Sequence, residues 1–109
     1  GSISPGLRMR FKAMHTFTER LPLVEPDIDA LLTGTNTIAC MQSGVMNGLL
    51  AEIEGIINRY RHTYPQLCVV ICGGDASFFD KKLKGAIFTV PELVLIGLNR
   101  ILLYNVALQ

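Results

Sequence analysis

The chain has 109 residues, of which 50% are hydrophobic and 17% charged, and its formal net charge is +1. This length fits one domain or part of one, and the nearly neutral balance gives no basic field of the kind that nucleic-acid binding needs. The mean hydropathy of +0.37 is high for a small soluble domain. We therefore expect some of the apolar surface to be covered by a partner, another domain or a second copy of the chain.

The three cysteines, Cys40, Cys68 and Cys72, are odd in number and include no Cys-x-x-Cys pair. This pattern predicts neither a disulfide framework nor a zinc site. A reducing, cytoplasmic setting fits it best, and the first residues also lack the long apolar stretch of a signal peptide.

The segment 4–21 predicts the first helix, with Ser4 as its N-cap and Pro5 at its first helical position, where a missing N–H is harmless. Apolar residues recur in it at helical spacing, namely Leu7, Phe11, Met14 and Leu21. Two turn-rich stretches follow at 22–29 and 33–37.

The longest helix is predicted from Thr37 to about Arg61. Its buried stripe is expected to comprise Ile38, Met41, Val45, Leu49, Ile53, Ile56 and Tyr60. A row of small residues also runs along it, which usually indicates the close approach of another backbone: Gly44, Gly48, Ala51 and Gly55. The Gly-x-x-x-Gly spacing is known from membrane helices, but polar residues interrupt any spanning segment, so no membrane association is predicted.

The remaining chain predicts a buried strand at 67–72, a helix from about Asp75 to Lys84, a short strand at 86–90 and a last helix that Pro91 opens and that ends near Ala107. The last helix is apolar nearly all round, so it should be sandwiched between layers or buried in an interface. The order of elements predicts an α/β fold with too few strands for a complete sheet.

The buried strand ends in Gly73-Gly74-Asp75, which fits neither Gly-x-Gly-x-x-Gly nor the phosphate loop Gly-x-x-x-x-Gly-Lys-Ser/Thr. Two interpretations stay open. One is a tight turn with Asp75 capping the next helix; the other is a ligand site in which glycines let a flat molecule approach the backbone.

Two further features also allow both a structural and a ligand-binding interpretation. Thr37 either shares with Asn36 the task of capping the long helix, which the spacing favours, or offers its hydroxyl and the helix-start N–H groups to a polar substrate. Arg8, Lys12 and His15 form a cationic row that suits a phosphate, although a solvated helix face is the favoured interpretation. Nothing in the sequence completes a catalytic set or a metal-ligand cluster, so no catalytic residue and no metal ligand are predicted.

Taken in order, the motifs at 1–24, 34–61, 69–79 and 90–105 resemble the C-terminal half of a type III pantothenate kinase. The most specific parts are the Gly-x-Ile-x-Pro-Gly opening with Leu-Pro downstream, and Thr37 followed by Ser43-Gly44. This resemblance implies the second ribonuclease H-like domain of the actin and sugar-kinase superfamily, mostly helical here with few strands. Residues 1–109 would then be the C-terminal domain of a two-domain kinase whose N-terminal domain is absent.

The resemblance implies that the intact protein phosphorylates pantothenate with ATP in coenzyme A biosynthesis. The family works as a homodimer and needs Mg²⁺ and a monovalent cation, potassium or ammonium. Thr37 corresponds to the threonine that contacts pantothenate, and Gly73 and Gly74 match the glycines beside the adenosine. Asp75 follows them, at a position that varies in the family, and is included in the expected ATP site.

The chain lacks three motifs of the family: the Asp-x-Gly-Asn phosphate motif, the Gly-x-Asp-Arg segment with the general base, and the Asp-x-Gly-Thr-Ala cation segment. We therefore expect no kinase turnover from these 109 residues alone. Two alternatives stand beside the kinase. One is a non-catalytic regulatory or transcriptional protein of the same fold, as the label Bvg accessory factor of some relatives suggests; the other is a scaffold domain without a ligand.

Overall fold

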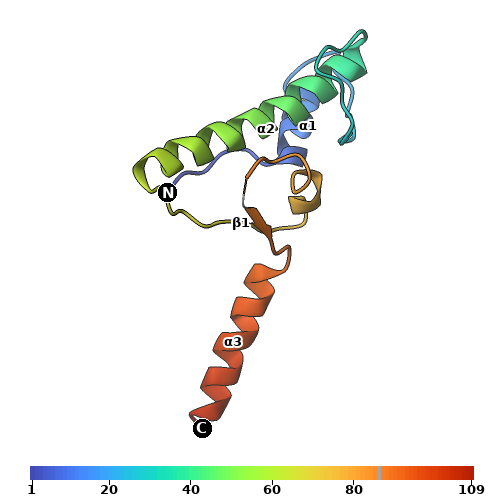
Figure 1. Ribbon diagram of the computed structural model, residues 1–109. Coiled ribbons are helices and arrows are strands. Elements are labelled where there is room, and N and C mark those ends of the chain that lie inside the picture. Colours follow the sequence, from blue (N-terminus) through green and yellow to red (C-terminus); the bar gives the residue numbers. More distant parts are fainter. Residues whose placement is uncertain (86) are drawn as a thin grey trace. The chain divides into compact units, whose positions relative to one another are not determined.

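The computed structural model describes residues 1–85 and 87–109 (Figure 1). In chain order the elements are α1 (Leu7–Thr16), α2 (Thr37–Thr63), β1 (Val69–Ile71), the 3-10 helix η1 (Ala76–Phe78), β2 (Ile87–Thr89) and α3 (Leu93–Ala107). The chain divides into two compact units, Gly1–Asn58 and Arg59–Gln109. The first unit holds α1 and most of α2, and the second holds the two strands and α3.

Helix α1 begins later than the sequence predicts. Gly6 is its N-cap, in an extended conformation (φ −69°, ψ 170°), and the Gly6 carbonyl accepts the hydrogen bond of the Arg10 N–H at 3.1 Å. The prediction of Ser4 as N-cap is therefore wrong. The Ser4 hydroxyl instead donates to the carboxylate of Glu52, a partner 48 residues away that no local pattern reveals.

The same helix ends at Thr16, earlier than the predicted Leu21. The Thr18 hydroxyl donates to the Met14 carbonyl, which gives this last turn a side-chain partner in place of a further turn of helix. The His15 Nδ1 atom lies 2.7 Å from the Leu21 carbonyl, so the chain folds back against the end of the helix.

The core of the first unit lies between α1, the segment after it and the N-terminal half of α2. Its buried apolar side chains are Leu7, Phe11, Val24, Met41, Val45, Met46 and Leu49. Phe11 is 1% exposed, and burial of such a side chain contributes roughly 1.5–3 kcal/mol. The predicted stripe of α2 is confirmed at Met41, Val45 and Leu49 but is wrong at Ile38, Ile56 and Tyr60, which are 51%, 41% and 47% exposed. The stripe is thus buried only in the N-terminal half of the helix.

Helix α2 begins at Thr37, as predicted, and ends at Thr63, two residues beyond the prediction. Its row of small residues is exposed, and a Cβ atom built on Gly44, Gly48 or Gly55 would meet nothing within 4 Å. Within the described residues, then, the close backbone approach predicted for this row is absent. Such an approach occurs instead at Gly34, whose Cβ would lie 2.4 Å from the backbone nitrogen of Cys40.

The second unit contains a parallel two-stranded sheet, in which Val69 pairs with Ile87 and Ile71 with Thr89. The α/β class is confirmed at this coarse level. Ala86, which the sequence placed in the second strand, lies outside the described residues.

The helix predicted from Asp75 to Lys84 is wrong. Only the three residues of η1 are helical, and tight turns follow, with hydrogen bonds from the Phe79 N–H to the Ala76 carbonyl and from the Leu83 N–H to the Phe79 carbonyl. Ala76, Phe79 and Leu83 are buried. A series of turns can bury residues three or four positions apart, as a helix does. The helical spacing of these apolar residues therefore led to a wrong prediction of a helix.

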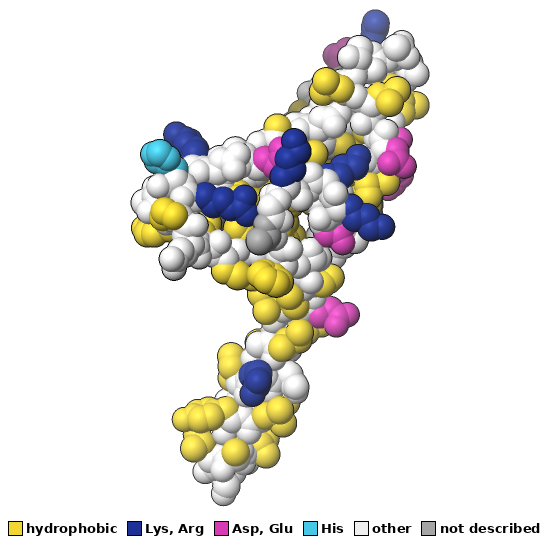
Figure 2. Space-filling model, in the orientation of Figure 1, with side chains coloured by type: hydrophobic (Ala, Val, Ile, Leu, Met, Phe, Trp, Pro, Cys, Tyr) yellow, Lys and Arg dark blue, Asp and Glu magenta, His cyan; other side chains and the backbone are white. Residues whose placement is uncertain are grey.

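Helix α3 ends at Ala107, as predicted, but begins at Leu93, with Glu92 rather than Pro91 next to it. None of its residues is buried, and Figure 2 shows hydrophobic side chains along its visible surface. The expectation that it is covered on several sides stays a prediction. Among residues 1–85 and 87–109, no helix has both the length and the apolar character that crossing a membrane requires.

Candidate functional site

The start of α2 carries the first candidate residue, Thr37. Asn36 caps the helix, since its Oδ1 atom accepts the Ala39 N–H at 2.9 Å and its carbonyl accepts the Cys40 N–H at 2.8 Å. Of the two capping candidates, Asn36 is therefore the cap. Thr37 is exposed, and among the described residues no hydrogen-bond partner is found for its hydroxyl.

The backbone around Thr37 presents donors as well. An N-cap side chain satisfies one of the first N–H groups of a helix and leaves the others unpaired. The amides of Thr37 and Ile38 have no partner among the described residues, so they stand beside the Thr37 hydroxyl at the positive end of the helix dipole. This arrangement can hold a polar or anionic group.

The loop before Thr37 is fixed against the side of α2. The Ser43 hydroxyl, in a buried residue, donates to the Leu32 carbonyl at 2.5 Å. The Asn47 amide donates to the Leu31 carbonyl at 3.1 Å and to the Ser43 hydroxyl at 3.2 Å. Sequence reasoning singled out Ser43 only as part of a motif and missed this positioning role. Ser43 and Asn47 on one helix face were the available signal.

Gly34 also helps to hold the loop before Thr37 against α2. Its Cα lies so close to the first turn of α2 that a Cβ would fall 2.4 Å from the Cys40 nitrogen and 2.5 Å from the Ala39 carbonyl carbon. Real side chains do not occupy such distances, so only glycine lets the loop lie flat against the helix start. The position of Thr37 thus depends on contacts on both sides of it.

The second candidate is the turn Gly73-Gly74-Asp75, which follows β1. Gly73 has φ +100°, a conformation that favours glycine, and its N–H donates to the Pro91 carbonyl at 3.0 Å. Asp75 occupies the N-cap position of η1, but it makes no side-chain capping hydrogen bond, so the prediction that its side chain caps the next helix is wrong.

Neither backbone conformation nor a contact with the described residues explains why residue 74 is glycine. It does not have a positive φ, it is exposed, and a Cβ built on it would meet nothing within 4 Å. Neither backbone strain nor packing within the described chain therefore requires glycine here. A bare main chain with open space beside it is a surface on which a flat ligand can lie.

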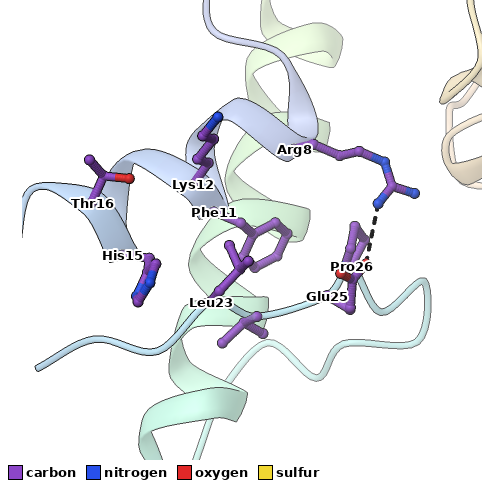
Figure 3. Close-up of a pocket in the computed structure, with 9 residues that line it drawn as sticks. Arg8, Phe11, Lys12, His15, Thr16, Leu23, Glu25 and Pro26 are labelled. Carbon is purple, nitrogen blue, oxygen red and sulfur yellow. Dashed lines mark hydrogen bonds and ion pairs between the residues drawn. The ribbon is translucent and has the colours of Figure 1, made fainter.

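A pocket of about 370 Å³ lies beside α1 in the first unit (Figure 3). The predicted cationic row of Arg8, Lys12 and His15 lines it, together with an apolar floor that includes Phe11 and Leu23. The floor was missed from sequence because the loop after α1 supplies most of it, namely Leu23, Val24 and Pro26. Its mixed lining suits a small anion with an apolar body.

Electrostatics favour the plainer interpretation of this row. Arg8 Nη1 lies 3.2 Å from Glu25 Oε2, which offsets its charge, and the two side chains are 61% and 81% exposed. Such exposed ion pairs contribute about 0–1 kcal/mol. These features are typical of a solvated helix face, as the sequence favoured.

Comparison with known proteins agrees with the motifs. A family model described as type III pantothenate kinase matches residues 1–59, which include Thr37. The chain is 55% identical over 106 residues to the type III pantothenate kinase of Cytophaga hutchinsonii, covering 97% of this chain and 45% of the relative. It is 50% identical over 105 residues to the protein of that name from Bacteroides fragilis strain YCH46, covering 96% of this chain and 43% of the relative.

These proteins define a class of small-molecule kinases. The chain belongs to the type III pantothenate kinase family, which confirms the resemblance seen in its motifs. It spans about half the length of the curated relatives it matches.

Proposed function

We propose that this chain is one half of an enzyme that transfers the γ-phosphoryl group of ATP to pantothenate, giving 4'-phosphopantothenate for coenzyme A biosynthesis. The observation that carries the proposal is the 55% identity over 97% of the chain with a relative named for pantothenate phosphorylation. In this enzyme the chain supplies binding surfaces, and the general base comes from the part of the protein that this chain does not contain.

Thr37 is the residue that contacts pantothenate in this proposal. Its exposed hydroxyl is not used as the helix cap, because Asn36 has that role. A hydroxyl both donates and accepts, and the helix-start amides add donors next to it. Pantothenate carries hydroxyl, amide and carboxylate groups, which are the partners that such donors bind.

Gly73, Gly74 and Asp75 are the residues that face ATP. The support is the exposed backbone at Gly73 and Gly74 and the open space where a Cβ of either would lie. A purine ring stacks on bare main chain more closely than on a side chain, so valine at Gly74 would displace it. Asp75 extends the same turn toward η1.

Magnesium and a monovalent cation, potassium or ammonium, are part of the proposal for the whole enzyme. The described residues contain no group of three or more His, Cys, Asp or Glu that could hold a metal ion. No role in the reaction is therefore assigned to either ion through this chain. A homodimer in the cytoplasm is the assembly and location that we propose.

The alternative of a non-catalytic regulatory protein has weaker support. Relatives that are 47–55% identical to the chain carry the name of a kinase. The net charge of +1 also gives little attraction to nucleic acid.

The test is a chimera in which this chain replaces the matching 106 residues of the Cytophaga hutchinsonii relative. We expect the chimera to convert pantothenate and ATP to 4'-phosphopantothenate and ADP, as followed by mass spectrometry, and the 109-residue chain alone to give none. A folded chimera that binds neither substrate would contradict the proposal.

A further inference from the structure

The most unusual surface of the molecule is that of α3. Eleven large apolar side chains between Leu93 and Leu108 are 41–67% exposed: Leu93, Val94, Leu95, Ile96, Leu98, Ile101, Leu102, Leu103, Tyr104, Val106 and Leu108. Arg100 is the helix's single charged residue. Isolated apolar residues on a surface need no explanation, but a contiguous set of this size marks a surface that another structure covers.

The distribution of these side chains indicates what kind of structure covers them. Successive residues of an α-helix are rotated by about 100°, so each side of α3 can be examined in turn. Its three polar residues and its glycine, which are Asn99, Arg100, Asn105 and Gly97, are interspersed with apolar residues around the helix and form no continuous polar face. A helix without a polar face is surrounded, not merely touched on one side.

The described residues of its own unit, Arg59–Gln109, do not provide that surrounding. The sheet has two strands, and no residue of α3 is buried against it. A second copy that paired with α3 about a two-fold axis would cover one side of each helix and leave the other side exposed. A larger, separate layer is needed.

The relatives have additional length that could form such a layer. This chain corresponds to 45% of the Cytophaga hutchinsonii kinase and 43% of the Bacteroides fragilis kinase, so more than half of each relative lies outside the match. We propose that α3 is an inserted arm, surrounded in the intact enzyme by the half of the kinase that this chain does not contain. The inference rests on the proposed two-part kinase, and it makes α3 the main contact between the parts.

The contact has an expected energetic consequence. An uncovered helix of this length is marginal in water, and its amides exchange quickly with solvent. When side chains such as Leu102 and Ile101 are buried, opening of the helix requires the whole contact to separate. Slow hydrogen exchange of the α3 amides therefore indicates that another part of the protein covers the helix.

Hydrogen–deuterium exchange followed by mass spectrometry tests this. We compare peptides covering 93–107 in the 109-residue chain and in the chimera with the Cytophaga hutchinsonii relative, and we measure the mass of both in solution by sedimentation. We expect exchange of these peptides to be at least about 100-fold slower in the chimera than in the monomeric chain. Peptides covering 41–49, in the core of the first unit, are the internal control and should differ little.

Two variants of the chimera complete the experiment. Leu102→Lys should remove the protection of 93–107, whereas Leu102→Met, which keeps size and polarity, should retain it. Retained protection of 41–49 in both variants shows that the rest of the chain is folded. If Leu102→Lys prevents folding altogether, the comparison of chimera and isolated chain still decides the question.

Two outcomes would overturn the inference. Equal, fast exchange in both proteins would show that nothing covers α3. Slow exchange in the isolated chain would show that its own residues cover α3 if the chain is a monomer, or a second copy if it is a dimer. Catalysis is measured separately: protected α3 without phosphorylation of pantothenate would count against the proposed function, and phosphorylation with unprotected α3 only against this inference.

Discussion

Arg10 Nη2 lies 2.9 and 2.7 Å from the two carboxylate oxygens of Glu52, which fastens α1 to the middle of α2. The same carboxylate accepts the Ser4 hydroxyl, and Arg10 Nε donates to the Pro5 carbonyl at 2.8 Å. The segment before α1 is thus held by Arg10 of α1 and by Glu52 of α2. Several consequences of this and other contacts can be measured.

The hydrogen bond from Ser4, followed by those from Arg10 and its charge, lowers the pKa of Glu52 below its ordinary 4.5. Because the folded-state pKa is depressed, the stabilisation is present above pH 4.5 and is lost as the pH falls through the lowered value. We expect Glu52→Gln to unfold at a lower temperature than the wild-type chain at about pH 7, and the difference to shrink as the pH falls below 4.5. Circular dichroism during heating measures both.

Glu54→Gln is the matched control for this prediction, because it removes a carboxylate two residues farther along the same helix and leaves the Arg10 contact in place. A difference between Glu52→Gln and the wild-type chain that stays constant over the whole acidic range would contradict the role assigned to the Glu52 charge.

The cap of α2 gives a second prediction. Asn36→Ala removes the acceptor of the Ala39 N–H and should lower the free energy of unfolding by about 1 kcal/mol. Asn36→Asp keeps an oxygen in the same place and should cost much less. Urea unfolding of the three proteins provides the comparison, and an equal loss in both variants would argue that packing, not capping, fixes Asn36.

Two glycines of the first unit should respond to alanine in opposite directions. Gly34→Ala forces the new Cβ into backbone atoms of α2 and should destabilise the chain by about 1–3 kcal/mol. Gly44→Ala places a methyl group in open space on a helix and should stabilise it by roughly 0.5–1 kcal/mol. Urea unfolding of the isolated chain measures both effects. A stabilising Gly34→Ala would mean that the loop does not lie against the helix.

The sequence predicted the parts of the fold that local signals govern. The start of α2 at Thr37 follows from Asn36, a good cap, placed directly before an apolar period. The end of α3 at Ala107 likewise agrees with the pattern. Predictions were wrong where the structure depends on partners far away in the sequence. Ser4, for example, does not cap α1 but donates a hydrogen bond to Glu52, 48 residues away.

The candidate sites divide in the same way. Thr37 and Gly74 could be selected from sequence because a motif contains them. Their local geometry required coordinates, since Gly34 and Ser43 fix the loop before Thr37 through contacts with α2. The difference between Gly73, which its positive φ explains, and Gly74, which nothing in the described chain explains, also depends on backbone angles that the sequence does not contain.

Gly74 allows a test of the nucleotide side of the proposed kinase. Gly74→Val in the chimera should raise the KM for ATP by about 10-fold or more, equivalent to about 1.4 kcal/mol, and leave the KM for pantothenate nearly unchanged. Ser77→Val, an exposed position three residues farther on, serves as the control. If both variants leave the KM for ATP as it is, the ATP site does not include this turn.

The vitamin side depends on Thr37, and steady-state kinetics of the chimera with Thr37→Val and Thr37→Ser decide its role. Valine keeps the shape of threonine and removes the hydroxyl, whereas serine keeps the hydroxyl. We expect Thr37→Val to lower kcat/KM for pantothenate by about 10–100-fold with an unchanged KM for ATP, and Thr37→Ser to retain most of the activity. Unchanged kcat/KM for pantothenate in a folded Thr37→Val chimera would contradict the assignment of Thr37 to the substrate site.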